Sequence, residues 1–126
     1  MVTLGIPLEV RKFIYETIET VGHLEVLCTF LSAPGKKWNA NSLQKELRSH
    51  VTIAGKQLEH LKSKGLIKDE GDGQYGFGPD DSIKEKLSHE LFDLYKKSPV
   101  SIISLIYDKP TDSLKVFADA FKMKKD

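Results

Sequence analysis

The sequence contains one cysteine, Cys28, and no uninterrupted apolar run approaching the roughly 18 residues that a membrane-spanning helix needs. An intramolecular disulfide is therefore excluded. The first residues also lack the basic segment followed by an apolar segment that is typical of a secretory signal. We expect a cytoplasmic protein that does not associate with membranes.

The residue patterns of metal sites and of catalytic sites are missing as well. The four histidines are scattered along the chain, and neither HxxxH nor CxxC spacing occurs. The segment GDGQYGFG lacks the Lys-Ser/Thr pair of a phosphate-binding loop, and no nucleophile lies beside a recognisable base. We expect no metal, no cofactor and no enzymatic activity.

Charge is distributed unevenly along a chain whose net charge is only +1. Residues 36–68 contain eight Lys and Arg but two Glu, a net charge of +6, so the rest of the chain carries −5. A basic segment of this kind attracts an anionic partner. With 126 residues, of which 40% are apolar and 29% charged, the chain has the size and composition of one globular domain.

Apolar residues recur at helical spacing at both ends of the chain. A first helix is predicted over residues 8–20 and a second from His23 to the Pro34-Gly35 pair. After residue 80, a helix to about Lys97 would bury a face made of Ile83, Leu87, Leu91 and Leu94. The segment VSIISLIY is too uniformly apolar to show a period, so strand and buried helix both fit, and the preceding Ser-Pro favours helix. A last helix is predicted from Pro110, with an inward face of Leu114, Phe117 and Phe121.

The middle of the chain predicts two short helices followed by a β-hairpin. Asn39 suits the N-cap of a helix with Leu43 and Leu47 buried. The next helix is predicted over Thr52–Lys64, with Ser49 or His50 near its cap and Gly65 in the left-handed position after it. Two short strands would then pair around an Asp72-Gly73 turn. Two helices joined by a short turn and completed by a hairpin make a winged helix-turn-helix.

The run from Trp38 to Phe77 resembles bacterial winged helix-turn-helix transcription regulators of the broad MarR/ArsR kind. The resemblance rests on the Leu43 and Leu47 pair, on the LxxL-x(3)-GLI ending and on the glycine-punctuated hairpin. It implies a single domain that is mostly α with a small β-hairpin. A winged helix-turn-helix core would span residues 23–78, with an additional N-terminal helix at 8–20 and C-terminal helices at 80–126. In MarR-like proteins such terminal helices hold a homodimer together.

The same resemblance implies which side chains contact double-stranded DNA. Those facing base edges would be Thr52, Lys56, Gln57 and His60. Those facing phosphates would be Ser42, Lys45, Arg48 and Ser49, and phosphate anchoring would also involve Lys56 and Lys62. The hairpin departs from the pattern, because its tip contains no Lys or Arg and is flanked by Asp69 and Glu70, where a groove-inserting wing is basic.

These patterns predict a DNA-binding transcriptional regulator that acts as a homodimer. The alternative is a winged-helix protein-protein interaction module with negligible DNA affinity, which the acidic hairpin favours. No residue pattern identifies a small-molecule effector. Trp38 is expected to plug the core with its indole N–H satisfied locally, although it would also suit a clamp on a sugar-phosphate backbone. Cys28 is expected to act as a small buried hydrophobe.

Overall fold

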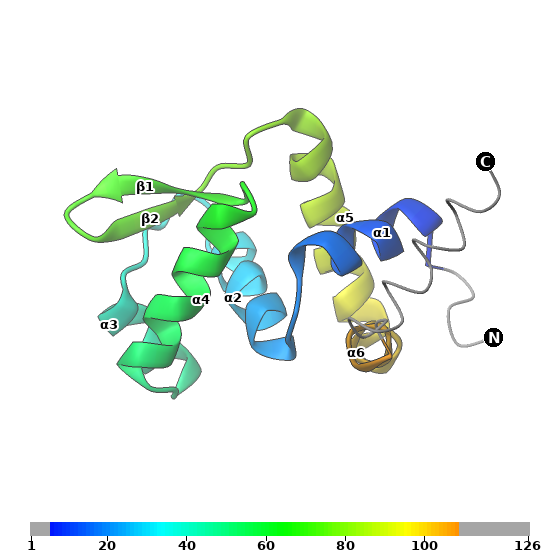
Figure 1. The fold of residues 1–126 in the computed structure, drawn as a ribbon, viewed down its shortest axis with the longest axis horizontal. Coiled ribbons are helices and arrows are strands. Elements are labelled where there is room, and N and C mark those ends of the chain that lie inside the picture. Colours follow the sequence, from blue (N-terminus) through cyan, green and yellow to red (C-terminus); the bar gives the residue numbers. More distant parts are fainter. Residues whose placement is uncertain (1–5, 109–126) are drawn as a thin grey trace, which may run out of the picture.

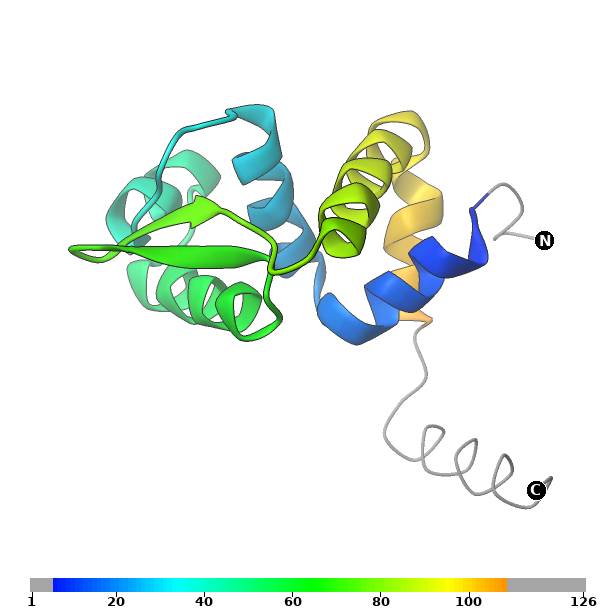
Figure 2. The same ribbon diagram turned by 90° about the horizontal axis from the view of Figure 1, so that it is seen from above.

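The computed structural model describes residues 6–108, which form six helices and one β-hairpin. In chain order the elements are α1 (Leu8–Thr17), α2 (Val21–Ser32), α3 (Ala40–Leu47), α4 (Val51–Ser63), β1 (Ile67–Gly71), β2 (Gln74–Phe77), α5 (Ser82–Lys97) and α6 (Pro99–Tyr107). Figures 1 and 2 show α3, α4 and the hairpin at one end of the molecule and α1, α5 and α6 at the other, with α2 in contact with both α4 and α5. The expectation of a mostly α fold with a small β-hairpin is confirmed.

Local capping determines where the first two helices end and begin. The first helix was predicted to end at residue 20, but α1 ends at Thr17. It ends there because Ile18 is extended and its side chain is buried in the core. The hydroxyl oxygen of Thr20 then accepts a hydrogen bond from the His23 N–H at 3.1 Å. Since Thr20 is the N-cap, α2 begins at Val21 instead of at His23.

The hairpin forms around the predicted Asp72-Gly73 turn. Both turn residues have positive φ, 54° and 75°, as the commonest two-residue hairpin turns require. β1 and β2 are antiparallel, with Ile67 opposite Phe77. Trp38 forms a single bridge to β2, since its N–H donates to the Tyr75 carbonyl at 2.9 Å and its carbonyl accepts from the Tyr75 N–H at 2.7 Å. The loop after α2 is thereby tied to the hairpin.

α5 and α6 share one continuous apolar core with the other helices. Along α5, Leu91 is buried and Leu87 and Leu94 are partly buried, as predicted. Ile83 is 67% exposed, so its predicted burial is wrong. It lies in the first turn of α5, which projects beyond the neighbouring helices (Figure 1) and leaves this side chain uncovered by the described residues.

The apolar segment VSIISLIY is helical, as the Ser-Pro start favours, and Pro99 occupies the first turn of α6. Ile102, Leu105 and Ile106 of this helix are buried in the core. The helix predicted from Pro110 onward lies outside the described residues.

A Schellman turn ends α4 and directs the chain into the hairpin. The Leu66 N–H donates to the Leu61 carbonyl at 3.1 Å, and the Gly65 N–H donates to the Lys62 carbonyl at 3.0 Å. Gly65 has a φ of 75°, which is the left-handed conformation predicted for this position. Glycine is therefore favoured at position 65, because it adopts this backbone conformation without strain.

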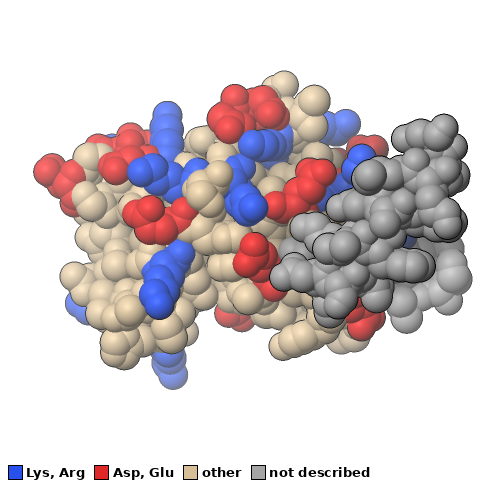
Figure 3. Space-filling view, viewed as in Figure 1, with Lys and Arg blue, Asp and Glu red and all other residues tan. Residues whose placement is uncertain are grey.

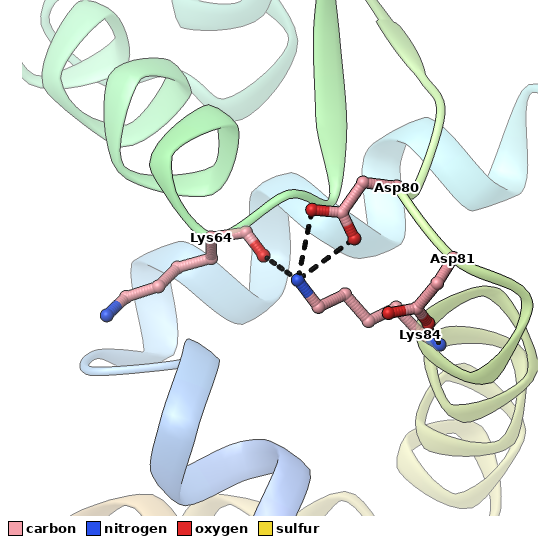
Figure 4. Close-up of polar contacts among 4 residues, drawn as sticks. All are labelled: Lys64, Asp80, Asp81 and Lys84. Carbon is pink, nitrogen blue, oxygen red and sulfur yellow. Dashed lines mark hydrogen bonds and ion pairs between the residues drawn. The ribbon is translucent and has the colours of Figure 1, made fainter.

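Lys84 of α5 holds this turn from the side, as Figure 4 shows. Its ammonium nitrogen lies 3.0 Å from the Lys64 carbonyl oxygen, and 3.0 and 3.2 Å from the two carboxylate oxygens of Asp80. A cation is favourable at this place because the last carbonyls of a helix carry partial negative charge. The Asp80 N–H also donates to the Gly65 carbonyl at 2.9 Å. These contacts join the end of α4 to the start of α5.

Replacing Gly65 by Ala is expected to destabilise the fold more than the same change at Gly73. Both glycines have a φ of 75°, and an L-residue in the left-handed conformation costs about 1–2 kcal/mol. A Cβ atom would meet nothing within 4 Å at Gly73, whereas at Gly65 it would collide with the Asp80 carboxylate and with the Lys84 ammonium group. Urea denaturation of the two variants measures the difference in the free energy of unfolding.

The control for this comparison is the double change Asp80→Ala and Lys84→Ala, which removes the side-chain atoms that the new Cβ would meet. In that background the extra cost at Gly65 is expected to disappear. Equal costs for Gly65→Ala and Gly73→Ala in the otherwise wild-type chain would contradict the account of this turn.

Candidate nucleic-acid interface

α3 and α4 form a two-helix unit joined by Arg48, Ser49 and His50. Arg48 takes a left-handed conformation with a φ of 53°, and the Ser49 N–H donates to the Gln44 carbonyl at 3.0 Å. The Nδ1 atom of His50 accepts a hydrogen bond from the Thr52 N–H at 3.2 Å and so caps α4. The tight connection fixes how α4 packs against α3 and so determines which side of α4 faces the core.

The buried side of α4 follows the predicted spacing. Ala54, Leu58 and Leu61 are buried in the core, and Leu43 of α3 is buried with them. Leu47, the second residue of the predicted buried pair on α3, is partly buried. The opposite side of α4 is exposed to solvent.

Five of the nine predicted contact residues lie exposed on α3, its C-cap and α4. They are Lys45, Arg48, Thr52, Lys56 and Lys62. Four of them are cationic. Their side chains are available to bind phosphate groups or, in the case of Thr52 and Lys56, to reach base edges from the N-terminal half of α4.

His60 does not point away from the core with Thr52 and Lys56. Its Nε2 atom lies 2.7 Å from the Thr17 carbonyl oxygen, and because a carbonyl only accepts, Nε2 carries the proton. The His60 ring also stacks on His23 of α2, with centroids 3.7 Å apart and an angle of 2° between the planes. His60 therefore fastens α4 to α1 and α2, and its expected role at a base edge does not fit this placement.

Gln57 lies on the same flank of α4, about one helical turn before His60. Its Oε1 atom is buried and has no hydrogen-bond partner among the described residues, and its amide nitrogen packs against Gly22 at the start of α2. A Cβ atom on Gly22 would collide with that nitrogen. Gln57 is therefore a packing residue in this conformation, which does not agree with the expected base contact.

Neither of the two predicted serines is fully exposed to solvent. The Ser42 hydroxyl accepts from the Asn39 N–H at 3.0 Å, while the Asn39 side chain accepts from the Ser42 N–H at 2.7 Å. This reciprocal pair caps α3 and confirms Asn39 as the predicted N-cap. The Ser49 hydroxyl oxygen is buried without a partner among residues 6–108. Of the four predicted contact residues in this segment, Lys45 and Arg48 are exposed, as are the neighbouring Asn41 and Glu46.

A groove of about 560 Å³ runs between α4, the start of α3 and the hairpin. It is lined by Ala40, Thr52, Gly55, Lys56, Leu58, Glu59, Gly73 and Tyr75. The Tyr75 hydroxyl donates to the Glu59 carboxylate at 2.9 Å, and this hydrogen bond raises the pKa of Tyr75. The groove thus combines one lysine with a carboxylate that is already hydrogen-bonded.

The hairpin carries three acidic side chains on its surface. Asp69, Glu70 and Asp72 are exposed, and the ammonium group of Lys37 lies 3.9 Å from the Glu70 carboxylate. Figure 3 shows basic and acidic side chains interspersed over the face that it presents. Any anion approaching this face meets local cations and not one continuous basic surface.

Trp38 is 3% exposed and belongs to the core, which confirms the plug and excludes the clamp. The Lys36 ammonium group lies 4.0 Å from the centroid of its ring, a cation-π contact. The indole nitrogen is buried and has no hydrogen-bond partner in the described part of the chain, so the expected local partner is missing there.

Comparison of the chain with protein-family models, with curated proteins and with solved structures finds no match in any of the three. Within residues 6–108, no group of three or more His, Cys, Asp and Glu side chains is placed to hold a metal ion. The helices described here are all too short or too polar to cross a membrane.

The change His60→Ala is expected to lower the stability of the fold. The matched control is Lys56→Ala, a change at the surface of the same helix. The His60 change removes a hydrogen bond to a helix-terminal carbonyl and a ring stack, a loss of about 1–2 kcal/mol. Lys56 is exposed, so its truncation changes stability by less than about 0.5 kcal/mol. Thermal denaturation followed by circular dichroism compares the two, and equal melting temperatures would refute the fastening role of His60.

Native Cys28 is expected to resist alkylation by iodoacetamide at pH 8. Cys28 is partly buried, not fully buried as expected, and this partial burial, and secondly the nearby Glu25 charge, raises the pKa of its thiol to about 12. Because the thiolate is the reactive form, the native protein reacts roughly a thousandfold more slowly than the urea-unfolded chain. The rate is expected to rise with pH up to about 12, and a native rate matching the unfolded rate at pH 8 would contradict this environment.

Proposed function

We propose that the protein binds double-stranded DNA through a winged helix-turn-helix made of α2, α3, α4 and the hairpin. The observation that carries the proposal is that Lys45, Arg48 and Lys56 are all exposed on α3, its C-cap and α4. The order of elements, with a hairpin directly after α4, supports it. So does the resemblance of residues 38–77 to MarR/ArsR-like transcription regulators.

Binding would rest mainly on phosphate contacts. Lys45, Arg48, Lys56 and Lys62 are exposed cations that would neutralise backbone phosphates. Only Thr52 and Lys56 remain on the outer side of α4 as candidates for reading base edges, because Gln57 and His60 pack against α2 and α1. We therefore expect modest discrimination between sequences, with transcription regulated by occupancy of the site.

The test is fluorescence anisotropy of labelled duplex DNA in about 50 and 200 mM salt. Wild type is compared with Arg48→Ala, with Lys56→Ala and with Lys86→Ala, an exposed lysine of α5 that serves as the control. Each lost phosphate contact is expected to weaken binding and to reduce the salt slope by about one, while the control matches wild type. No binding at the lower salt, or an equal loss in the control, would contradict the proposal.

A second candidate function is a protein-protein interaction module. The exposed carboxylates of the hairpin and the groove beside α4 favour it, since both would suit a basic partner with an apolar anchor. This candidate predicts that the anisotropy experiment shows no DNA binding at either salt concentration. The two candidates are thus separated by the same measurement.

A further inference from the structure

α6 carries an apolar stripe that the described residues leave uncovered. The stripe consists of Val100, Ile103, Ser104 and Tyr107, which share one face of the helix by their spacing. Val100 and Tyr107 are each 75% exposed, and the other two are partly exposed. The opposite face packs into the core. Covering this stripe would remove apolar surface from water, which is favourable.

The α6 stripe is too small to hold a second copy of the chain by itself. A nine-residue helix is about 13 Å long at 1.5 Å per residue and about 10 Å across, so one face offers on the order of 100–200 Å². A stable interface buries about 800 Å² on each partner. Exposed polar residues, Lys97 and Ser98 before the helix and Asp108 after it, bound the stripe at both ends.

The chain itself supplies a segment that matches the stripe. Residues 109–126 continue directly from the end of α6, and their apolar residues Leu114, Phe117 and Phe121 repeat the spacing of Val100, Ile103 and Tyr107. We propose that this segment covers the α6 stripe within the same chain, as an amphipathic helix antiparallel to α6. Leu114 then lies beside Tyr107, and Phe121 lies beside Val100.

The short link between α6 and the proposed helix suits this arrangement. Asp108 to Thr111 would link the two helices, a length typical of antiparallel helical neighbours, and Thr111 or Asp112 suits an N-cap. A short tether holds the segment at an effective concentration of about millimolar, so a small apolar contact suffices within one chain. Lys115, Asp119 and Lys122 fall on the outer side of this helix.

Engineered disulfides test the proposal directly in the full chain. In a Cys28→Ala background, Val100→Cys with Phe121→Cys is expected to form an intramolecular disulfide in mild oxidant. The matched control, Val100→Cys with Asp119→Cys, places the second thiol on the outer side of the helix. The first pair is expected to close at least about tenfold faster, as measured by peptide mass spectrometry. Equal rates in the two pairs, or disulfides only between chains, would overturn the proposal.

A second experiment does not depend on the geometry of a disulfide. The wild-type chain is expected to be a monomer by light scattering after size exclusion, in place of the homodimer that the resemblance to MarR-like proteins implies. Phe117→Asp is expected to remain a folded monomer while binding more of the dye ANS, because the stripe becomes exposed. A wild-type dimer that Phe117→Asp converts to monomer would assign the stripe to a second copy and overturn the proposal. Unchanged dye binding would also count against it.

Discussion

The attachment of α4 along its C-terminal half is the constraint on which the described fold depends. His60 donates to the last residue of α1 and stacks on α2, while Lys84 of α5 reaches the carbonyl of Lys64 at the C-cap of α4. The left-handed Gly65 then turns the chain into the hairpin. α4 thus connects the elements at the two ends of the molecule, and its orientation determines which of its side chains reach solvent.

This attachment determines what the candidate interface can offer. Side chains on the flank toward α2 are used for packing, and those on the opposite side of the N-terminal half remain free to contact a ligand. The cations of α3 and its C-cap extend that surface, while the hairpin contributes carboxylates. The proposed interface is therefore richer in groups that bind phosphate than in groups that distinguish bases.

Local signals in the sequence predicted most of the elements. Asn39, Gly65 and the Asp72-Gly73 turn have short-range roles, a cap or a positive φ, and each was found where its residue type indicates. Boundaries were less certain where tertiary burial decided them, as at Ile18, which leaves α1 to enter the core. Ile83 was predicted to be buried from its helical spacing but is exposed. Helical spacing does not show how far the neighbouring helices extend.

The candidate site was predictable only in part, for a related reason. Periodicity separates the buried side of α4 from the rest, but Gln57 and His60 lie on the flank between the two sides. Whether such residues face solvent depends on a contact distant in sequence, here the Thr17 carbonyl and the His23 ring. A stacked histidine pair from two helices leaves no pattern that a single sequence reveals.

The most direct test of the account is a titration of the ¹⁵N-labelled protein with duplex DNA, followed by amide chemical shifts. If α4 presents its outer side to DNA, shifts concentrate in α3, in the connection around Arg48 and in the first half of α4. Amides around His60 and throughout α6 are predicted to change little. Shifts confined to α5 and α6, or no shifts at millimolar DNA in low salt, would contradict the claim that α4 presents its outer side to DNA.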